Sequence, residues 1–479
     1  KKVYRAKIKQ FLDRLERQIL SRFEKLEAEY SRSKDPVPFD DRLKLTYQAI
    51  EEGQEWGQTW DSAWFHLQGR IPPAWAGREV VAHLDFNGEA LIFSSSGEPL
   101  QGLTNGSIFG NITRHTFLIT QKSLANEPVD LWVETAANAI MGINCPRDPG
   151  RGNSIVENIG NEIALRGASA IPGEQIGRHG SYRGVANRMR IALYPKDLYN
   201  LWLDMELLNG LLDTVPASGS RYSRILEGLV EVTNRFQDNE ENTGRCRELL
   251  APLLKQPAHA SAPVINAVGH AHIDTGWLWP VRETIRKSAR TFANQLELMD
   301  RYPDYVFGAS QPQHYLFVKD HYPALYDRIC KAVSEGRWEL QGGMWVEPDC
   351  NLISGESFIR QILHGKNFFK DEFGEEVTNC WIPDVFGYSA SMPQILKLAG
   401  INHFLTQKMS WSQFNRFPYT TFRWRGIDGT EVLTHFPPED TYNSQLQPYD
   451  LQRSEANFVE KAVLDEMMCL FGVGDGGGG

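Results

Sequence analysis

The spacing of hydrophobic positions changes several times along the chain. Apolar residues recur at helical spacing over residues 1–31 and again over 196–255, where the repeats at 198–212 and 225–236 are clearest. Residues 71–150 instead carry short alternating runs between Asn-Gly and Ser-Gly turns, which is typical of antiparallel strands. We therefore expect a helical segment, a β-sandwich and a second helical stretch, in that order.

Beyond residue 263 the pattern becomes one of short apolar strands that alternate with longer helices. It predicts strands at 264–268, 305–309, 338–341, 378–382, 403–405, 431–435 and 469–473, and helices at 282–300, 323–335, 355–373, 392–399 and 454–468. Alternation at this spacing indicates a parallel sheet with helices outside it. The predicted fold class is α/β, with a parallel, seven-stranded, barrel-like catalytic β/α domain preceded by a β-sandwich and a helical N-terminal region.

These patterns divide the chain into four segments. The first two are an N-terminal helical segment at 1–70 and a β-sandwich-like domain at 71–195. A helical connector follows at 196–262 and ends in a linker that contains Pro257. The catalytic β/α domain occupies 263–479, and we expect it to be truncated at its C-terminus.

Composition narrows the class of protein. Hydrophobic residues make up 41% and charged residues 23%, as in soluble globular proteins, and no apolar run reaches the length of a membrane span. The net charge of 50 − 60 = −10 argues against a nucleic-acid partner. The six scattered cysteines form no C-x-x-C pair, which favours reduced thiols and a cytoplasmic location. Aromatic residues, at 11%, suit sugar rings as well as cores.

Candidate chemistry gathers where the predicted strands end, and the first strand leads into His270, His272 and Asp274. Residues two apart on extended backbone point the same way, so these side chains can face one point. An imidazole beside a carboxylate forms half of a divalent-metal site. A hydrogen-bonded strand end without a metal explains the same pattern.

Later strand ends add polar groups at the same predicted edge. Residues 310–314 could bind a substrate or form a satisfied loop, whereas 342–349 combine two glycines, an aromatic residue and two carboxylates. Asp384 lies among apolar and aromatic residues, so we expect either a structural arginine that pairs with it or a metal that it shares with His272 and Asp274. Lys408 follows the fifth strand, and Asp475 precedes four glycines. Carboxylates, aromatics and a metal together suggest hydrolysis of a sugar.

Several of these segments resemble a known family when they are taken in order. Residues 269–277, 343–349 and 381–387 are similar to the signature segments of the α-mannosidases of glycoside hydrolase family 38. The closer resemblance is to the cytosolic and bacterial branch, through residues 277–280, 406–411 and 474–479. It is strong over about 260–479 and less specific over 1–255.

The resemblance implies a retaining α-mannosidase that releases terminal mannose from oligosaccharides with a divalent metal in the sugar-binding subsite. It implies His272, Asp274 and Asp384 as metal ligands, with Asp384 also the nucleophile. Zinc is the expected ion, although sites of histidine and carboxylate accept several metals. Asp475 is the expected acid/base, and Glu347 is the competing candidate.

The resemblance also implies how the sugar is held. Trp277 and Phe386 would form aromatic walls, and Asp349 and Lys408 would hydrogen-bond sugar hydroxyls. The expected partner is a mannose-containing oligosaccharide, with no nucleic acid and no membrane. Homo-oligomerisation is left open.

One departure from the family concerns the metal site. The family completes this site with a second histidine well downstream of the nucleophile, and the sequence ends 479 − 384 = 95 residues after Asp384. His403 and His435 lie in strand patterns and are expected to be structural. We therefore expect an incomplete metal site in this chain and weak or no activity from it alone.

Two other functions fit part of the pattern. His270 and His272 resemble the first-strand His-x-His of amidohydrolases, but the later strand ends carry carboxylates and aromatics instead of further histidines. A non-catalytic carbohydrate-binding protein would explain the aromatics but not the carboxylates around His272 and Asp274.

Overall fold

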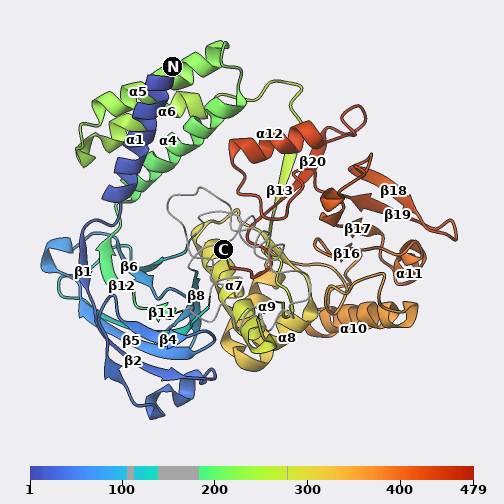
Figure 1. Ribbon diagram of the computed structural model, residues 1–479, viewed down its shortest axis with the longest axis horizontal. Helices are drawn as coiled ribbons and strands as arrows, with labels where there is room; N and C mark the ends of the chain where they lie inside the picture. The colour runs from blue at the N-terminus through green and yellow to red at the C-terminus, as the bar shows by residue number, and fades with distance from the viewer. Residues whose placement is uncertain (105–112, 139–182, 278, 479) are drawn as a thin grey trace.

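The computed structural model describes residues 1–104, 113–138, 183–277 and 279–478. These residues form a helical bundle, a β-sandwich and a parallel β/α unit (Figure 1). No helix among them is long and apolar enough to cross a membrane. Cys145, Leu278 and Gly479 lie outside the described residues, and the other five cysteines are unpaired thiols.

The helical bundle joins the start of the chain to a segment much later in the sequence. Its helices are α1 (Lys2–Gln18), α4 (Lys196–Thr214), α5 (Ser220–Arg235) and α6 (Thr243–Leu254). Their apolar faces share one core, in which the rings of Phe11 and Phe236 meet edge to face at 5.5 Å. The helical periodicity at 198–212 and 225–236 therefore marks the faces that pack in this bundle.

The expected helix over residues 1–31 is wrong beyond Gln18. Leu20 has a positive φ of 59°, which ends the helix. Phe23 continues the helical spacing only by coincidence, since it pairs with Ala192 in an antiparallel ladder. Leu26 likewise points into the sandwich core. Five strands lie between residues 23 and 70, so the helical assignment of 1–70 is corrected to a short helix followed by part of the sandwich.

The sandwich consists of two antiparallel sheets and a short ribbon. One sheet has the order β1-β12-β6-β9 and contains β1 (Phe23–Lys25), β12 (Arg188–Leu193), β6 (Val80–Asp85) and β9 (Thr116–Thr120). The other has the order β3-β2-β5-β10-β7-β8 and contains β3 (Gln48–Ala49), β2 (Glu27–Ser33), β5 (Ser62–Arg70), β10 (Pro128–Ala136), β7 (Glu89–Phe93) and β8 (Pro99–Leu103). The ribbon pairs β11 (Arg183–Val185) with β4 (Glu55–Gln58).

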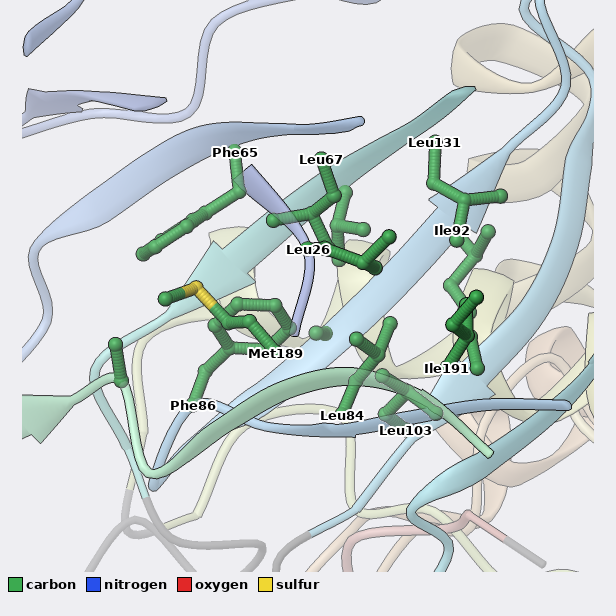
Figure 2. Packing of buried hydrophobic residues seen from close by; sticks show 14 of the residues in the cluster. Leu26, Phe65, Leu67, Leu84, Phe86, Ile92, Leu103, Leu131, Met189 and Ile191 are labelled. Carbon is green, nitrogen blue, oxygen red and sulfur yellow. The ribbon is translucent and has the colours of Figure 1, made fainter. Parts of the chain in front are cut away.

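In the larger sheet, both faces are buried along β7 and the first half of β5. Phe65 and Leu67 of β5 point into the core between the two sheets, which Figure 2 shows from close by. Trp64 lies on the opposite face and packs, with Leu91 and Phe93 of β7, into the core of the β/α unit. Successive residues of a strand face opposite sides, so the same strands hold the sandwich together and attach it to the β/α unit.

The β/α unit contains two four-stranded sheets, with strands within each sheet mostly parallel. The first has the order β15-β14-β13-β20 and consists of β15 (Trp338–Leu340), β14 (Phe307–Ala309), β13 (Val264–His270) and β20 (Glu466–Phe471). The second has the order β16-β17-β19-β18 and consists of β16 (Asn379–Trp381), β17 (His403–Leu405), β19 (Glu431–His435) and the antiparallel β18 (Thr421–Arg425). The parallel α/β class is confirmed, but the described ladders do not confirm a closed seven-stranded barrel.

Helices connect these strands largely as the hydrophobic pattern predicts. They are α7 (Val281–Arg301), α8 (Pro312–His321), α9 (Pro323–Ser334), α10 (Gly355–Phe373), α11 (Met392–Leu398) and α12 (Pro448–Asn457). The helix expected at 454–468 is wrong: α12 starts earlier, at Pro448, where a capping box fixes its first turn, and residues 466–471 are strand β20. The segment 310–314 is also not only a loop, since α8 begins at Pro312.

Candidate active site

Two segments far apart in the sequence meet just beyond the end of β13. Ile273 forms an antiparallel bridge with Gly476, and the backbone N–H of Asp274 donates to the carbonyl of Asp475 at 2.8 Å. The bridge follows from topology, because β13 and β20 are parallel neighbours and their continuations leave the sheet at the same edge. The carboxylates of Asp274 and Asp475 are thereby brought to one place.

His272 lies at the centre of this place and is 3% exposed. Its Nδ1 is 2.9 Å from Oε1 of Glu347, and its Nε2 is 3.4 Å from Asp274 Oδ1 and 4.0 Å from Asp384 Oδ2. Burial alone would lower the pKa of His272, but the carboxylates of Glu347 and Asp274 outweigh it and hold that pKa well above its usual value. The ring is therefore oriented by Glu347 and surrounded by negative charge.

Asp384 follows the end of β16 and forms an ion pair with a lysine. Lys408 Nζ donates to Asp384 Oδ1 at 2.6 Å. The same ammonium lies 4.4 Å from the ring centres of both Phe386 and Trp411. Asp384 therefore has the cationic partner that its apolar surroundings require, a lysine rather than an arginine, and one oxygen remains directed toward His272.

Asp475 is buried at the start of the glycine turn, where it adopts a positive φ of 60°. The hydroxyl of Tyr442 donates to its Oδ1 at 2.6 Å, and the ring of Tyr442 also contacts His272. Burial raises the pKa of Asp475 to about 6, an effect that His272 and Tyr442 only partly offset. Asp475 is therefore a carboxyl group that can carry or release a proton near neutral pH.

The donor set at this site fits a divalent ion. One ligand atom each from His272, Asp384 and Asp475 lies within 4.8 Å of the others. Within the described residues, neither the buried Nε2 of His272 nor the buried Oε2 of Glu347 makes a hydrogen bond. A buried ring nitrogen that faces carboxylates and has no hydrogen-bond partner is the arrangement expected of a metal ligand. The identity of the ion is not fixed by these groups.

The other predicted sugar-binding residues lie around this cluster in different ways. Trp277 and Phe386 are exposed, as aromatic walls would need to be. Asp349 instead uses Oδ1 to accept the backbone N–H groups of Asn351 and Leu352, so it fixes the turn that follows it. In the part of the chain that the structure describes, Asp349 makes no hydrogen bond or ion pair with His272 or Asp384.

His270, considered with His272 in the sequence, is not part of the cluster. Its Nδ1 is 3.0 Å from the carbonyl of Gly308, and Trp381 Nε1 donates to its Nε2 at 3.4 Å. Burial lowers the pKa of His270 to about 3, so the ring is neutral. Both ring nitrogens of His270 thus have hydrogen-bond partners in the protein, which does not support an amidohydrolase-like His-x-His pair.

A second polar layer adjoins the cluster and includes the segment 310–314, for which the sequence left both a substrate-binding role and a satisfied loop open. Gln311 Nε2 donates to the carbonyl of Ile273 at 2.9 Å, and His314 lies 2.8 Å from the hydroxyl of Thr275. Gln311 has a positive φ of 66° and is followed by Pro312, the first residue of α8. This Gln-Pro pair was the sequence signal for the polar layer. Tyr442 carried no comparable signal, since it lies in an irregular segment between β19 and α12.

A buried histidine among carboxylates lies at the carboxyl edge of the parallel strands, so the described residues form a β/α domain with a candidate metal site there. Two family models match the chain. Residues 262–479 match the glycosyl hydrolases family 38 N-terminal domain, and residues 23–156 match the alpha-mannosidase jelly roll domain. Residues 262–479 are therefore a family 38 N-terminal domain, and residues 23–156 match a domain of alpha-mannosidases.

Individual relatives agree with this family. Alpha-mannosidase 2C1 of Homo sapiens is 36% identical over 446 residues, which cover 92% of this chain and 40% of that protein. An alpha-mannosidase of Saccharomyces cerevisiae is 29% identical over 463 residues, again 93% of this chain and 40% of the relative. A solved alpha-mannosidase from Enterococcus faecalis V583 is 20% identical and covers 45% of this chain and 25% of its own, with a TM-score of 0.37 that is too low to define the fold. The chain spans about 40% of the length of the curated relatives.

Proposed function

We propose that the protein to which this chain belongs is a retaining α-mannosidase that hydrolyses terminal α-linked mannose from oligosaccharides. The observation that carries the proposal is the meeting of His272, Asp384 and Asp475 at the sheet edge of a family 38 domain. The relatives named above are alpha-mannosidases, which supports mannose as the sugar. A cytoplasmic location and homo-oligomerisation stay predictions.

Asp384 is the proposed nucleophile and Asp475 the proposed acid/base. Their nearest ligand atoms lie within 4.8 Å, which is in keeping with the separation of about 5–5.5 Å found in retaining enzymes. Lys408 donates to one oxygen of Asp384, which leaves the other oxygen free to attack the anomeric carbon. With its pKa raised to about 6, Asp475 is protonated below that pH and can donate a proton to the leaving oxygen. In the second step it can take a proton from the attacking water.

Glu347 is less suited to the acid role. Its Oε1 is committed to His272 Nδ1, and its side chain is 6% exposed. Burial raises its pKa, yet a movement of Glu347 toward a substrate would break the hydrogen bond that orients His272. Glu347 is therefore proposed to fix the ring, as carboxylates behind histidine ligands do.

His272 and Asp384, with Asp274, would hold the divalent ion, most simply zinc. When bound, the ion would act as a Lewis acid that binds sugar hydroxyls and stabilises the distorted ring. Asp475 also lies within ligand distance. Burial raises its pKa to about 6 although the hydrogen bond from Tyr442 lowers it, so a proton competes with the ion there, and a ligand must be ionised. Trp277, Phe386 and Lys408 would line the sugar, and Asp349 is proposed to do so only through its second oxygen.

We further infer a barrel-like arrangement of the seven parallel strands in the described part of the chain. Ser444, which follows β19, forms a parallel bridge with Phe471 of β20. This bridge links the second sheet to the first on one side, and Gly342 donates to the Asn379 side chain at 2.8 Å on the other. The two contacts support closure of the strand order without a continuous ladder.

The test uses the full-length protein and 4-nitrophenyl α-mannoside, with and without a chelator. We expect metal-dependent release with the α-anomer of mannose as first product, observed by NMR. Asp384→Asn should lower kcat/KM by more than about a thousandfold, the scale on which loss of a nucleophile acts. Asp428→Asn, at an exposed carboxylate of the β18–β19 turn, is the matched control and should have no effect.

Each rival function predicts a different result. A carbohydrate-binding protein would bind mannose without cleaving the glycoside, and an amidohydrolase would cleave amides or esters instead. Release of the β-anomer would remove the retaining mechanism. Full activity of Asp384→Asn would remove Asp384 from the nucleophile's role.

A further inference from the structure

The glycine turn that follows Asp475 is fastened to helix α7 by two side chains. The backbone N–H of Gly478 donates to the Thr291 hydroxyl at 2.8 Å. Gln295 Nε2, one helical turn further along α7, donates to the carbonyl of Gly478 at 3.2 Å. Tyr305 donates to Gln295 Oε1 at 2.6 Å, which directs the amide nitrogen toward the turn. Both backbone groups of Gly478 are therefore held by one helix.

The turn lies so close to α7 that it has no room for a side chain. Gly477 has a φ of +64°, and a Cβ there would lie 2.3 Å from Thr291 Oγ1 and 2.8 Å from Ile273 Cγ1. Gly476 is bridged to Ile273 on the other side. The turn is thus held between the helix and the end of the first strand, and its glycines permit this approach.

Asp475 is the residue whose place this fastening sets. Its carbonyl accepts from the N–H of Asp274, and its own backbone has a positive φ, which a non-glycine residue keeps only when its surroundings enforce it. Tyr442 fixes the far end of the side chain. Thr291 and Gln295 are the groups of α7 that hold the C-terminal side of the turn.

Helix α7 is itself anchored from its other face by the sandwich. Arg286 Nη1 donates to Ser62 of β5 at 3.0 Å, and Arg286 Nη2 donates to the carbonyl of Thr135 of β10 at 2.7 Å. Lys287 is paired with Glu89 of β7 at 2.5 Å. The helix cannot shift relative to the sandwich without disrupting buried charges, so it is a rigid support for the turn.

We propose that Thr291 and Gln295 are positioning residues for the Asp475 carboxylate. Through them, α7, which is anchored to the sandwich, holds the acid/base of the site in place. The inference rests on the proposed function for the role of Asp475. Neither residue touches the substrate, since both act through the backbone of Gly478. Displacement of a catalytic group by about 1 Å can lower the rate about a hundredfold, so a loosened turn should be measurable.

The test compares Thr291→Val, which keeps the shape but removes the acceptor, with Thr291→Ser, which keeps the hydroxyl. Two substrates separate protonation from other steps: mannobiose, whose leaving group needs a proton, and 2,4-dinitrophenyl α-mannoside, whose leaving group does not. For Thr291→Val in the full-length protein, we expect kcat/KM to fall about tenfold on mannobiose and less than about twofold on the aryl glycoside. Thr291→Ser should recover most of the loss.

Ser288→Ala is the matched control on the same helix. Its hydroxyl is equally buried but donates only to the carbonyl of Thr284, at 2.8 Å, away from the turn. Both substrates should be cleaved as by the wild type. Gln295→Leu removes the second hydrogen bond and gives an independent variant in case Thr291→Val fails to fold. Equal losses on the two substrates, or no loss in either variant, would overturn the proposal.

A second measurement separates this inference from the proposed function. Amide hydrogen exchange of a peptide that covers 474–478 should be faster in Thr291→Val than in the wild type and unchanged in Ser288→Ala. If the wild type cleaves neither mannoside, the proposed function fails and the catalytic role of the fastening fails with it. Unchanged exchange in Thr291→Val would overturn the fastening itself, whatever the activity.

Discussion

Arg286 on α7 joins two parts of the molecule through a guanidinium that is 1% exposed. Its Nη1 donates to Glu283 on the same helix at 2.9 Å, and its Nε lies 3.0 Å from Glu134 of β10. Its remaining donors reach Ser62 and the carbonyl of Thr135 on the sandwich. The perturbation is Arg286→Met, which keeps most of the apolar volume and removes the charge.

The expected loss follows from what Arg286 leaves behind. Glu134 and Glu283 are 4% and 0% exposed, so their carboxylates cannot be rehydrated in the folded protein. Burial raises the pKa of Glu283, but Arg286 and Arg290 lower it by more, so the pKa lies below its usual value. Glu283 is therefore charged and depends on these cations. Removal of one partner from a buried ion pair costs about 3–5 kcal/mol of unfolding free energy. At roughly 2–4 °C per kcal/mol, the melting midpoint should fall by about 6–20 °C.

The assay is thermal unfolding of wild type and variant, followed by circular dichroism. Arg360→Met on α10 is the matched control, because Arg360 Nε bonds Glu356 at 2.6 Å while both side chains are more than half exposed. An exposed pair contributes about 0–1 kcal/mol, so this midpoint should move by no more than about 4 °C. Adding Glu134→Gln and Glu283→Gln to Arg286→Met should restore part of the loss. A shift for Arg286→Met no larger than for Arg360→Met would refute the reasoning.

Two further predictions concern buried carboxyl groups. Burial raises the pKa of Glu439 to about 8, above its unfolded value, so its contribution to stability is present below about pH 4.5 and is lost as the pH rises through 8, by up to about 1.4 kcal/mol per pH unit. Denaturant unfolding between pH 5 and 8.5 should therefore show a flatter dependence of stability on pH for Glu439→Gln than for the wild type, and an equal dependence would contradict this. Glu347→Gln should weaken zinc binding by the full-length protein about 10–100-fold, because the carboxylate that orients His272 is lost; a titration that gives the wild-type Kd would exclude that role.

The sequence predicted the β/α unit better than the N-terminal region, for a physical reason. Strands such as β14 and β15 lie between helices of clear periodicity, so their positions follow from local patterns. Residues 23–70 form sandwich strands whose partners lie as far away as β12, and their spacing is compatible with a helix as well. Strand pairing over long separations is not visible in a local pattern.

For the site, the sequence could identify residues at strand ends but not the contacts between them. His272, Asp274, Asp384, Lys408 and Asp475 all follow strands, and the parallel order brings them to one edge. The use of Glu347 to orient a histidine depends on distances between separate loops, and so does the hydrogen bond of Tyr442. Such contacts are properties of the folded chain.

Helix α7 illustrates the same limit and its consequence for the site. Its charged positions repeat as on any solvent-facing helix, yet Arg286, Lys287 and Arg290 are at most 1% exposed because the sandwich covers them. Ala289 and Phe292 face the β/α core instead, so the helix is buried on both sides. Charged residues remain in such a place only when the covering surface supplies opposite charges, which Glu89 and Glu134 do. A family 38 domain that carried this helix without the sandwich would therefore expose three cations and lose the rigid support behind its acid/base turn.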